Sequence, residues 1–176
     1  NNLLKEEKSI VTDIAGTTRD SVDSYIKYHK KNFRLIDTAG LRRKSKIDDS
    51  LEFYSTVRTM RVVDECDIVA ILIDANKGFH AQDKNIINYV IDKGKGLLIV
   101  INKWDLIEKD TYTMKNFIED IIYQYPNLKY YPIIFISFKN NLRVTNVIAN
   151  TLSIYDLLKS QNGYNWEIII QRIVDI

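Results

Sequence analysis

The chain has 176 residues, of which 45% are hydrophobic, and its formal net charge at pH 7 is only +2. This is enough for one domain with its own core, and the balanced charge argues against a protein devoted to nucleic-acid or membrane surfaces, which would be strongly basic. No apolar run approaches the roughly 18 residues of a membrane span, and the single cysteine, Cys66, cannot form an internal disulfide, which favours a reducing, cytoplasmic setting.

Two strands are predicted in the first part of the chain. Residues 22–28 alternate apolar with polar side chains, the period-2 pattern of a half-exposed strand. A polar turn at residues 30–32 leads into residues 33–36, which we expect to pair antiparallel with the first strand. A charged loop after Gly40 then precedes a predicted helix, whose apolar stripe is Phe53, Val57, Met60 and Val63.

Buried strands alternate with helices along the rest of the chain. Continuous apolar runs at residues 68–73, 97–101 and 133–136 indicate strands that are covered on both faces. Between and after them, helical spacing of apolar residues predicts helices around residues 86–91, 114–125 and 144–158. After a polar break, Trp166, Ile169, Ile170 and Ile173 predict one further amphipathic helix.

This alternation predicts an α/β three-layer sandwich, with a mostly parallel sheet and helices on both faces. In such sheets, ligands bind at the carboxyl ends of the strands. The candidate functional motifs should therefore lie in loops that directly follow strands.

The first such loop is Asp37-Thr38-Ala39-Gly40, directly after the strand at residues 33–36. A carboxylate in this place can hold a magnesium ion, usually through water. The Gly40 amide can approach a γ-phosphate because no Cβ atom blocks it. On its own, the tetrapeptide is also an ordinary turn.

The second loop is Asn102-Lys103-Trp104-Asp105, directly after the strand at residues 97–101. The Asp105 carboxylate can accept two hydrogen bonds from guanine, from its ring N–H and its exocyclic amine, whereas adenine offers no donor at either place. The Lys103 stem can lie along the purine face, and Asn102 can bind both loop and base. The alternative is a polar turn between a strand and a helix, but the order of these residues after a buried strand predicts guanine recognition.

The third loop, at residues 13–20, precedes the first strand and contains Thr17 and Thr18. A threonine hydroxyl is a neutral oxygen ligand that suits magnesium, and a mobile loop can close it over a γ-phosphate. In isolation, the threonine pair could instead cap a helix or form a turn.

Together these loops carry a resemblance to a known family. Thr17-Thr18-Arg19-Asp20, with the loops at residues 37–40 and 102–105, resembles the G2, G3 and G4 motifs of translation-factor-class GTPases. Residues 41–47 and 52–61 are similar to the second G domain of the Der (EngA) family of bacterial GTPases. The likeness covers roughly residues 1–158. It implies a P-loop NTPase-type G domain at residues 1–160 and, at residues 161–176, the start of a truncated KH-like domain.

The chain departs from the family pattern in two places. The family's Gly-rich P-loop and the central strand leading into it are expected before Asn1. We therefore expect an open slot in the sheet between residues 33–36 and 68–73, and no activity from residues 1–176 alone. In addition, Ser137-Phe138-Lys139 stands where the family usually has Ser-Ala, so a bulky ring faces the expected base pocket.

The resemblance implies hydrolysis of GTP to GDP and phosphate with Mg²⁺. Some GTPases orient the attacking water with a glutamine at the position of Leu41, so the intrinsic rate should be slow. Related families hold a potassium ion at positions that match Thr12, Ile14 and Thr17. The resemblance assigns catalysis to Thr18 and Gly40, Mg²⁺ to Thr18 and Asp37, and the nucleotide to Asp37, Thr38, Ala39, Gly40, Leu41, Asn102, Lys103, Trp104, Asp105, Ser137, Phe138 and Lys139.

The expected partner is the large ribosomal subunit or its RNA, with neither membrane nor DNA. A basic cluster, Arg42, Arg43, Lys44 and Lys46, could meet ribosomal RNA phosphates or could simply be a solvated loop. The competing hypothesis is a degenerate G domain that acts as a non-hydrolysing interaction module. Phe138 and the absent P-loop favour that alternative, whereas Thr18, Asp37 and Asp105 argue against it.

Overall fold

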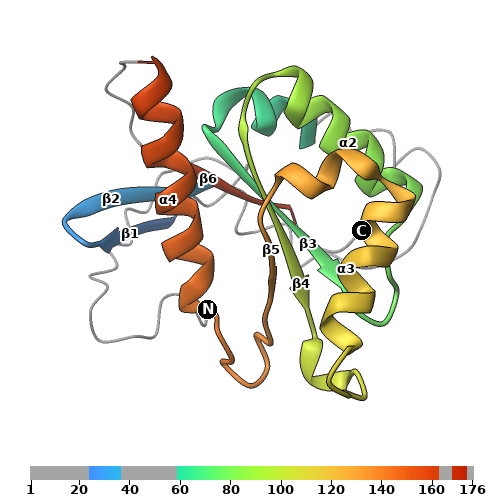
Figure 1. Ribbon diagram of the computed structural model, residues 1–176. Coiled ribbons are helices and arrows are strands. Elements are labelled where there is room, and N and C mark those ends of the chain that lie inside the picture. The colour runs from blue at the N-terminus through green and yellow to red at the C-terminus, as the bar shows by residue number, and fades with distance from the viewer. Residues whose placement is uncertain (1–23, 37–58, 163–167, 174–176) are drawn as a thin grey trace, which may run out of the picture.

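The computed structural model describes residues 24–36, 59–162 and 168–173 of the chain (Figure 1). Residues 59–65 are helical. The other elements are, in chain order, β1 (Ser24–Tyr28), β2 (Lys31–Ile36), β3 (Ile68–Asp74), α2 (Ala81–Asp92), β4 (Gly96–Asn102), the 3₁₀ helix η2 (Trp104–Leu106), α3 (Thr113–Gln124), the 3₁₀ helix η3 (Pro126–Tyr130), β5 (Ile133–Phe135), α4 (Thr145–Asn162) and β6 (Ile168–Ile173).

The strands form one sheet in the order β1-β2-β6-β3-β4-β5. β1 and β2 are antiparallel, and the other neighbouring strands are parallel. In Figure 1, α4 lies on one face of the sheet, while α2 and α3 lie on the other. The α/β class with helices on both faces of a mostly parallel sheet is therefore confirmed.

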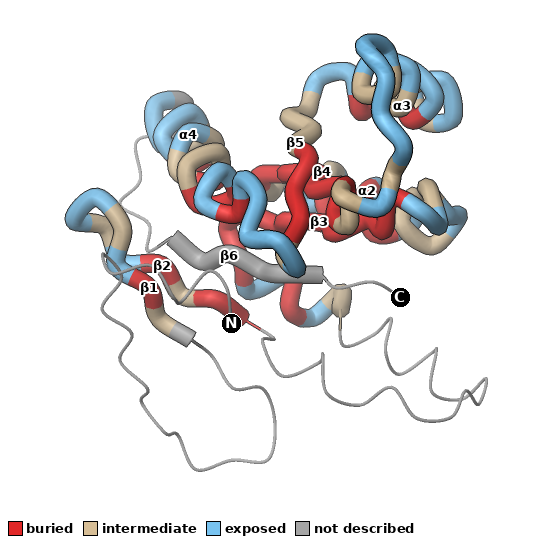
Figure 2. The backbone as a smooth tube through the Cα atoms, turned by 90° about the horizontal axis from the view of Figure 1, so that it is seen from below, coloured by how far each residue is buried: buried red, intermediate tan, exposed pale blue. Residues whose placement is uncertain are grey.

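Each face of the sheet carries its own hydrophobic cluster. One cluster joins alternate side chains of β3 and β4 to α2, α3 and the helix at residues 59–65. The other joins the opposite side chains of the same strands to α4 and to β2. Every residue of β3 and β4 is buried, as the red central strands of Figure 2 show. The apolar runs at residues 68–73 and 97–101 are thus strands that are covered on both faces, whereas Ile133 and Ile134 of the edge strand β5 are only half-buried.

The packing between β4 and α4 depends on a glycine. An ideal Cβ atom on Gly96 would lie 2.7 Å from Cγ2 of Ile154 and 2.9 Å from Cγ1 of Ile68. Because real Cβ contacts are not this short, the first residue of β4 has no room for a side chain.

Within the described residues, no helix is long and apolar enough to cross a membrane.

The C-terminal strand β6 corrects two predictions. Residues 168–173 form a strand rather than the amphipathic helix predicted from Trp166, Ile169, Ile170 and Ile173. β6 also runs parallel between β2 and β3, in the slot that we expected to be open. Three consecutive β-branched isoleucines at residues 168–170 favour a strand, and this preference outweighs the helical spacing. The domain boundary after residue 160 stays a prediction.

The registers of β3 and β4 determine where the candidate loops lie. Asp74, the last residue of β3, pairs with Asn102, the last residue of β4. Because the two strands are parallel, both loops leave the sheet at the same edge. β5 follows on the other side of β4 and ends at this edge as well.

Candidate functional site

The loop after β4 changes direction within one residue. Asn102 ends the strand, and Lys103 has a φ of 61° in the left-handed region. A non-glycine residue occupies this region at a cost in conformational energy, so surrounding contacts must hold it there. The 3₁₀ helix η2 then begins at Trp104 and places Asp105 in its first turn.

Asn102 joins this loop to its neighbours on both sides. Its side-chain oxygen accepts a hydrogen bond of 3.2 Å from the backbone N–H of Phe138. Its backbone carbonyl accepts one of 2.9 Å from the N–H of Ala75, and the Trp104 N–H donates to the Ile136 carbonyl at 3.1 Å. The structure therefore brings together the two predicted loops at residues 102–105 and 137–139.

Asp105 carries a buried acceptor. Among the described residues, its Oδ1 atom is buried and has no hydrogen-bond partner. The side chain of Ser137, which is itself fully buried, lowers the pKa of Asp105 by hydrogen bonding, and the nearby cations Lys139 and Lys109 lower it further. The carboxylate is thus charged at neutral pH. A buried acceptor without a donor is costly, and a ligand with N–H groups could supply the missing hydrogen bond.

Two aromatic residues assigned to this site lie mainly in the core. The Trp104 side chain is only 3% exposed, and its ring contacts Phe135 and Phe117 with centroid distances of 4.4 and 5.4 Å. The half-buried Phe138 packs against the cluster on the α4 side of the sheet. Trp104 therefore offers a ligand mainly its backbone, and the Phe138 ring has its hydrophobic neighbours in the cluster on the α4 side.

Sequence reasoning missed one residue at this edge of the sheet. The carboxylate of Asp74 binds the Nζ atom of Lys103 in an ion pair, with side-chain exposures of 5% and 44%. Its other oxygen accepts a hydrogen bond of 2.9 Å from the Asn76 N–H. Burial raises the pKa of Asp74, but the bonds from Lys103 and Asn76 outweigh that effect and leave it lowered. An acidic residue directly after the buried run at residues 68–73 was the available signal.

The remaining predicted site residues lie outside the described ranges. They are Thr12, Ile14, Thr17, Thr18, Asp37, Thr38, Ala39, Gly40 and Leu41, together with the basic cluster at residues 42–46. In the part of the chain that the structure describes, no group of three or more His, Cys, Asp or Glu side chains could hold a metal ion. The assignments of Mg²⁺ and K⁺ stay predictions.

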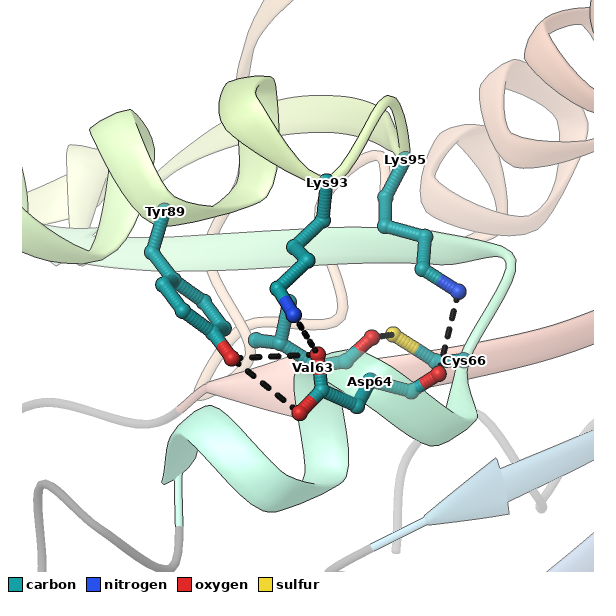
Figure 3. A network of polar contacts seen from close by, with 6 residues as sticks. All are labelled: Val63, Asp64, Cys66, Tyr89, Lys93 and Lys95. Atoms are coloured by element: carbon teal, nitrogen blue, oxygen red, sulfur yellow. Dashed lines mark hydrogen bonds and ion pairs between the residues drawn. The ribbon is translucent and has the colours of Figure 1, made fainter.

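A second polar network lies beside the turn that precedes β4 (Figure 3). The Tyr89 hydroxyl lies 3.0 Å from each carboxylate oxygen of Asp64. Lys93 Nζ also contacts that carboxylate at 3.0 Å, and Lys95 Nζ donates to the Asp64 carbonyl at 3.1 Å. Burial raises the pKa of the neighbouring Cys66 to about 12, so the thiol stays protonated. This network joins the helix at residues 59–65 to the turn between α2 and β4.

Comparison with known proteins identifies close relatives. Residues 1–103 match the family model described as 50S ribosome-binding GTPase. The chain is 46% identical to GTPase Der of Finegoldia magna over all 176 residues, which are 39% of that protein's length. It is 49% identical to GTPase Der of Clostridium tetani over 148 residues, covering 84% of this chain and 34% of that one. The chain thus spans between a third and two-fifths of these relatives.

Two solved structures have a similar fold at 27% sequence identity. One is Era in complex with MgGDPNP and a segment of 16S ribosomal RNA, with a TM-score of 0.64 over 88% of this chain and 50% of that one. The other is a variant of Aquifex aeolicus Era bound to GDP and aluminium fluoride, with a TM-score of 0.63 over the same shares.

Proposed function

The chain belongs to the family of 50S ribosome-binding GTPases, and we propose that its loop at residues 102–105 recognises the guanine base of GTP and GDP. The observation that carries this proposal is the buried, unpartnered Oδ1 atom of Asp105. Guanine presents the ring N–H and the exocyclic amine that such a carboxylate accepts, and the pair is charge-assisted. Adenine has no donor at these places, so it would leave the acceptor unpaired.

The neighbouring groups support a base pocket at this edge. Asn102 holds the loop to the segment after β5 through Phe138, and the Ser137 side chain lowers the pKa of Asp105. The Lys103 side chain is 44% exposed, so its stem could lie along the purine face. Because the Phe138 ring packs against core residues, it does not argue for a degenerate domain that has lost its base pocket.

We further propose that the protein hydrolyses GTP to GDP and phosphate. Thr18 and Asp37 would hold Mg²⁺, since hydroxyl and carboxylate oxygens are the ligands that this ion prefers. When bound, the ion neutralises charge on the phosphate oxygens. Gly40 lets its backbone N–H approach the γ-phosphate, and Thr12, Ile14 and Thr17 are candidates for a potassium site. With Leu41 after this glycine, the chain supplies no glutamine there to orient water.

The proposed setting is assembly of the large ribosomal subunit in the cytoplasm. The matching family is described as 50S ribosome-binding, and the structurally similar Era was solved with a ribosomal RNA segment. The basic cluster Arg42, Arg43, Lys44 and Lys46 provides cations that can neutralise RNA phosphates.

Competition for a fluorescent nucleotide tests the base assignment. Mant-GDP bound to the full-length protein should be displaced by GDP and GTP and should resist a large excess of ADP and ATP. Equal displacement by guanine and adenine nucleotides, or no mant-GDP binding at all, would contradict the proposal.

A further inference from the structure

Asp74 and Lys103 form an ion pair at the sheet edge that carries the candidate base pocket. Asp74 is the last residue of β3, and its side chain is 5% exposed, whereas that of Lys103 is 44% exposed. The carboxylate is fixed from a second direction by the Asn76 N–H at 2.9 Å. The Lys103 ammonium group is thus held by a buried partner that is itself hydrogen-bonded, while the side chain as a whole remains partly exposed.

The backbone of Lys103 makes this contact informative. Its φ of 61° places the residue in the left-handed region, which a lysine occupies at an energetic cost, so its surroundings must hold it there. On one side, Asn102 is anchored by its β-sheet pairing to Asp74 and by the Ala75 N–H. On the other side, the Trp104 N–H is bound to Ile136. The lysine side chain is directed back to β3 by the same turn.

We infer that Asp74 is a positioning residue for guanine-nucleotide binding, which fixes the Lys103 side chain in the orientation that the purine requires. This role rests on the proposed function, because Lys103 is expected to cover the purine face. A lysine side chain loses conformational entropy when it is ordered, which costs free energy. If Asp74 orders it beforehand, the nucleotide does not bear this cost on binding.

The role predicts a specific pattern among variants. Asp74→Asn keeps the shape of the side chain but removes its charge. It should weaken GDP binding about tenfold to a hundredfold, because a charged hydrogen bond to Lys103 is lost. Lys103→Ala should also weaken GDP binding. In the Lys103→Ala background, Asp74→Asn should change GDP affinity less than about twofold, because Asp74 acts through the lysine. Asp74→Glu, which restores the charge, should recover part of the loss.

Asp67→Asn is the matched control. Asp67 lies just before the same strand at its opposite end and is 8% exposed, about as buried as Asp74. It should leave GDP affinity unchanged even if it lowers stability. Isothermal titration with GDP on the full-length proteins, alongside their thermal transitions, separates affinity from folding.

The outcomes distinguish this inference from the function on which it rests. Suppose that the wild-type protein binds GDP, and that Asp74→Asn changes GDP affinity equally with and without the Lys103 side chain. This result would overturn the positioning role alone. Failure of the wild-type protein to bind GDP would overturn the proposed function and this role with it.

A second experiment needs no Asp74 variant and measures, by NMR, how fast the Nζ protons of Lys103 exchange with water in the nucleotide-free protein. The signal, assigned by its loss in Lys103→Arg, should show slow exchange, and fast exchange would contradict a held ammonium group.

Discussion

The side-chain oxygen of Asn102 accepts a 3.2 Å hydrogen bond from the backbone N–H of Phe138, and this bond ties the loop after β4 to the loop after β5. Asn102 is only 7% exposed, so water cannot easily replace it as a partner. The candidate base-reading loop thus begins with an asparagine that has a structural role even when no nucleotide is bound.

Replacing this residue should therefore destabilise the protein before any ligand is considered. Asn102→Ala leaves the Phe138 N–H without its acceptor, which should lower the free energy of unfolding by about 1–3 kcal/mol. Urea denaturation followed by circular dichroism measures the change. Asn140→Ala, at an exposed position, is the control, and an equal loss in both variants would show that the bond has no special weight.

Trp104 should behave as a core residue. Because its side chain is 3% exposed and packs on Phe117 and Phe135, Trp104→Ala should cost about 3–5 kcal/mol of unfolding free energy. Tyr123→Ala, at a side chain that is 88% exposed, should change it by no more than about 0.5 kcal/mol. Thermal or urea unfolding of the two variants checks this, and a Trp104→Ala variant as stable as the wild type would contradict the packing.

Acid should weaken the contact between β3 and the loop after β4. The pKa of Asp74 is lowered in the folded protein, where Lys103, the Asn76 N–H and the charge of Lys77 face its carboxylate, from an ordinary value of 3.8. A carboxyl group with a lowered folded pKa stabilises the fold at pH values above its unfolded pKa. This contribution is lost as the pH falls through the folded pKa.

The measurement is urea unfolding from about neutral pH to about pH 3, a range in which carboxyl groups bind protons. As the pH is lowered, the free energy of unfolding should decrease in the wild type, and it should decrease less steeply in Asp74→Asn. Asp64, Asp105 and Asp110 also have lowered pKa values, so the variant keeps part of the slope. Identical slopes would show that Asp74 is not stabilised as the anion.

The position of β6 makes a prediction about the backbone. Ile170 pairs with Leu35 of β2 and with Ile68 of β3, so β6 is hydrogen-bonded on both sides. Ile170→Pro removes a ladder donor from a central strand and should abolish cooperative unfolding or lead to aggregation. Lys27→Pro in the edge strand β1 is the control and should be milder. A cooperative, unshifted thermal transition for Ile170→Pro would show that β6 is dispensable to the sheet.

Local patterns predicted most of the described fold. Continuous apolar runs predicted the positions of β3, β4 and β5, and helical spacing of apolar residues predicted those of α2, α3 and α4. Both patterns follow directly from which side chains an element buries. The helix prediction was wrong for residues 168–173, because isoleucines at helical spacing also form a run of neighbouring β-branched residues. The strand pattern prevails because the sheet has a position for this segment between β2 and β3. The local sequence carries no information about that position.

The candidate site was predictable only in part. Order and position after a strand pointed to residues 102–105, whereas only the resemblance to the GTPase family pointed to residues 137–139. The pairing of Asp74 with Lys103 was not predicted, because it depends on the relative register of β3 and β4. The core position of the Trp104 ring likewise depends on packing with α3, which residue order alone does not determine.

Base selectivity of an Asp105→Asn variant tests the central claim most directly. An amide offers a donor where guanine also offers donors, whereas xanthine presents an acceptor at that edge. In the full-length protein, Asp105→Asn should therefore weaken GTP binding by about tenfold to several hundredfold and strengthen binding of xanthosine triphosphate. Competition against mant-labelled nucleotides measures both constants, with Asp110→Asn as a control at an exposed carboxylate. Unchanged affinities for GTP and xanthosine triphosphate in Asp105→Asn would contradict recognition of guanine by Asp105.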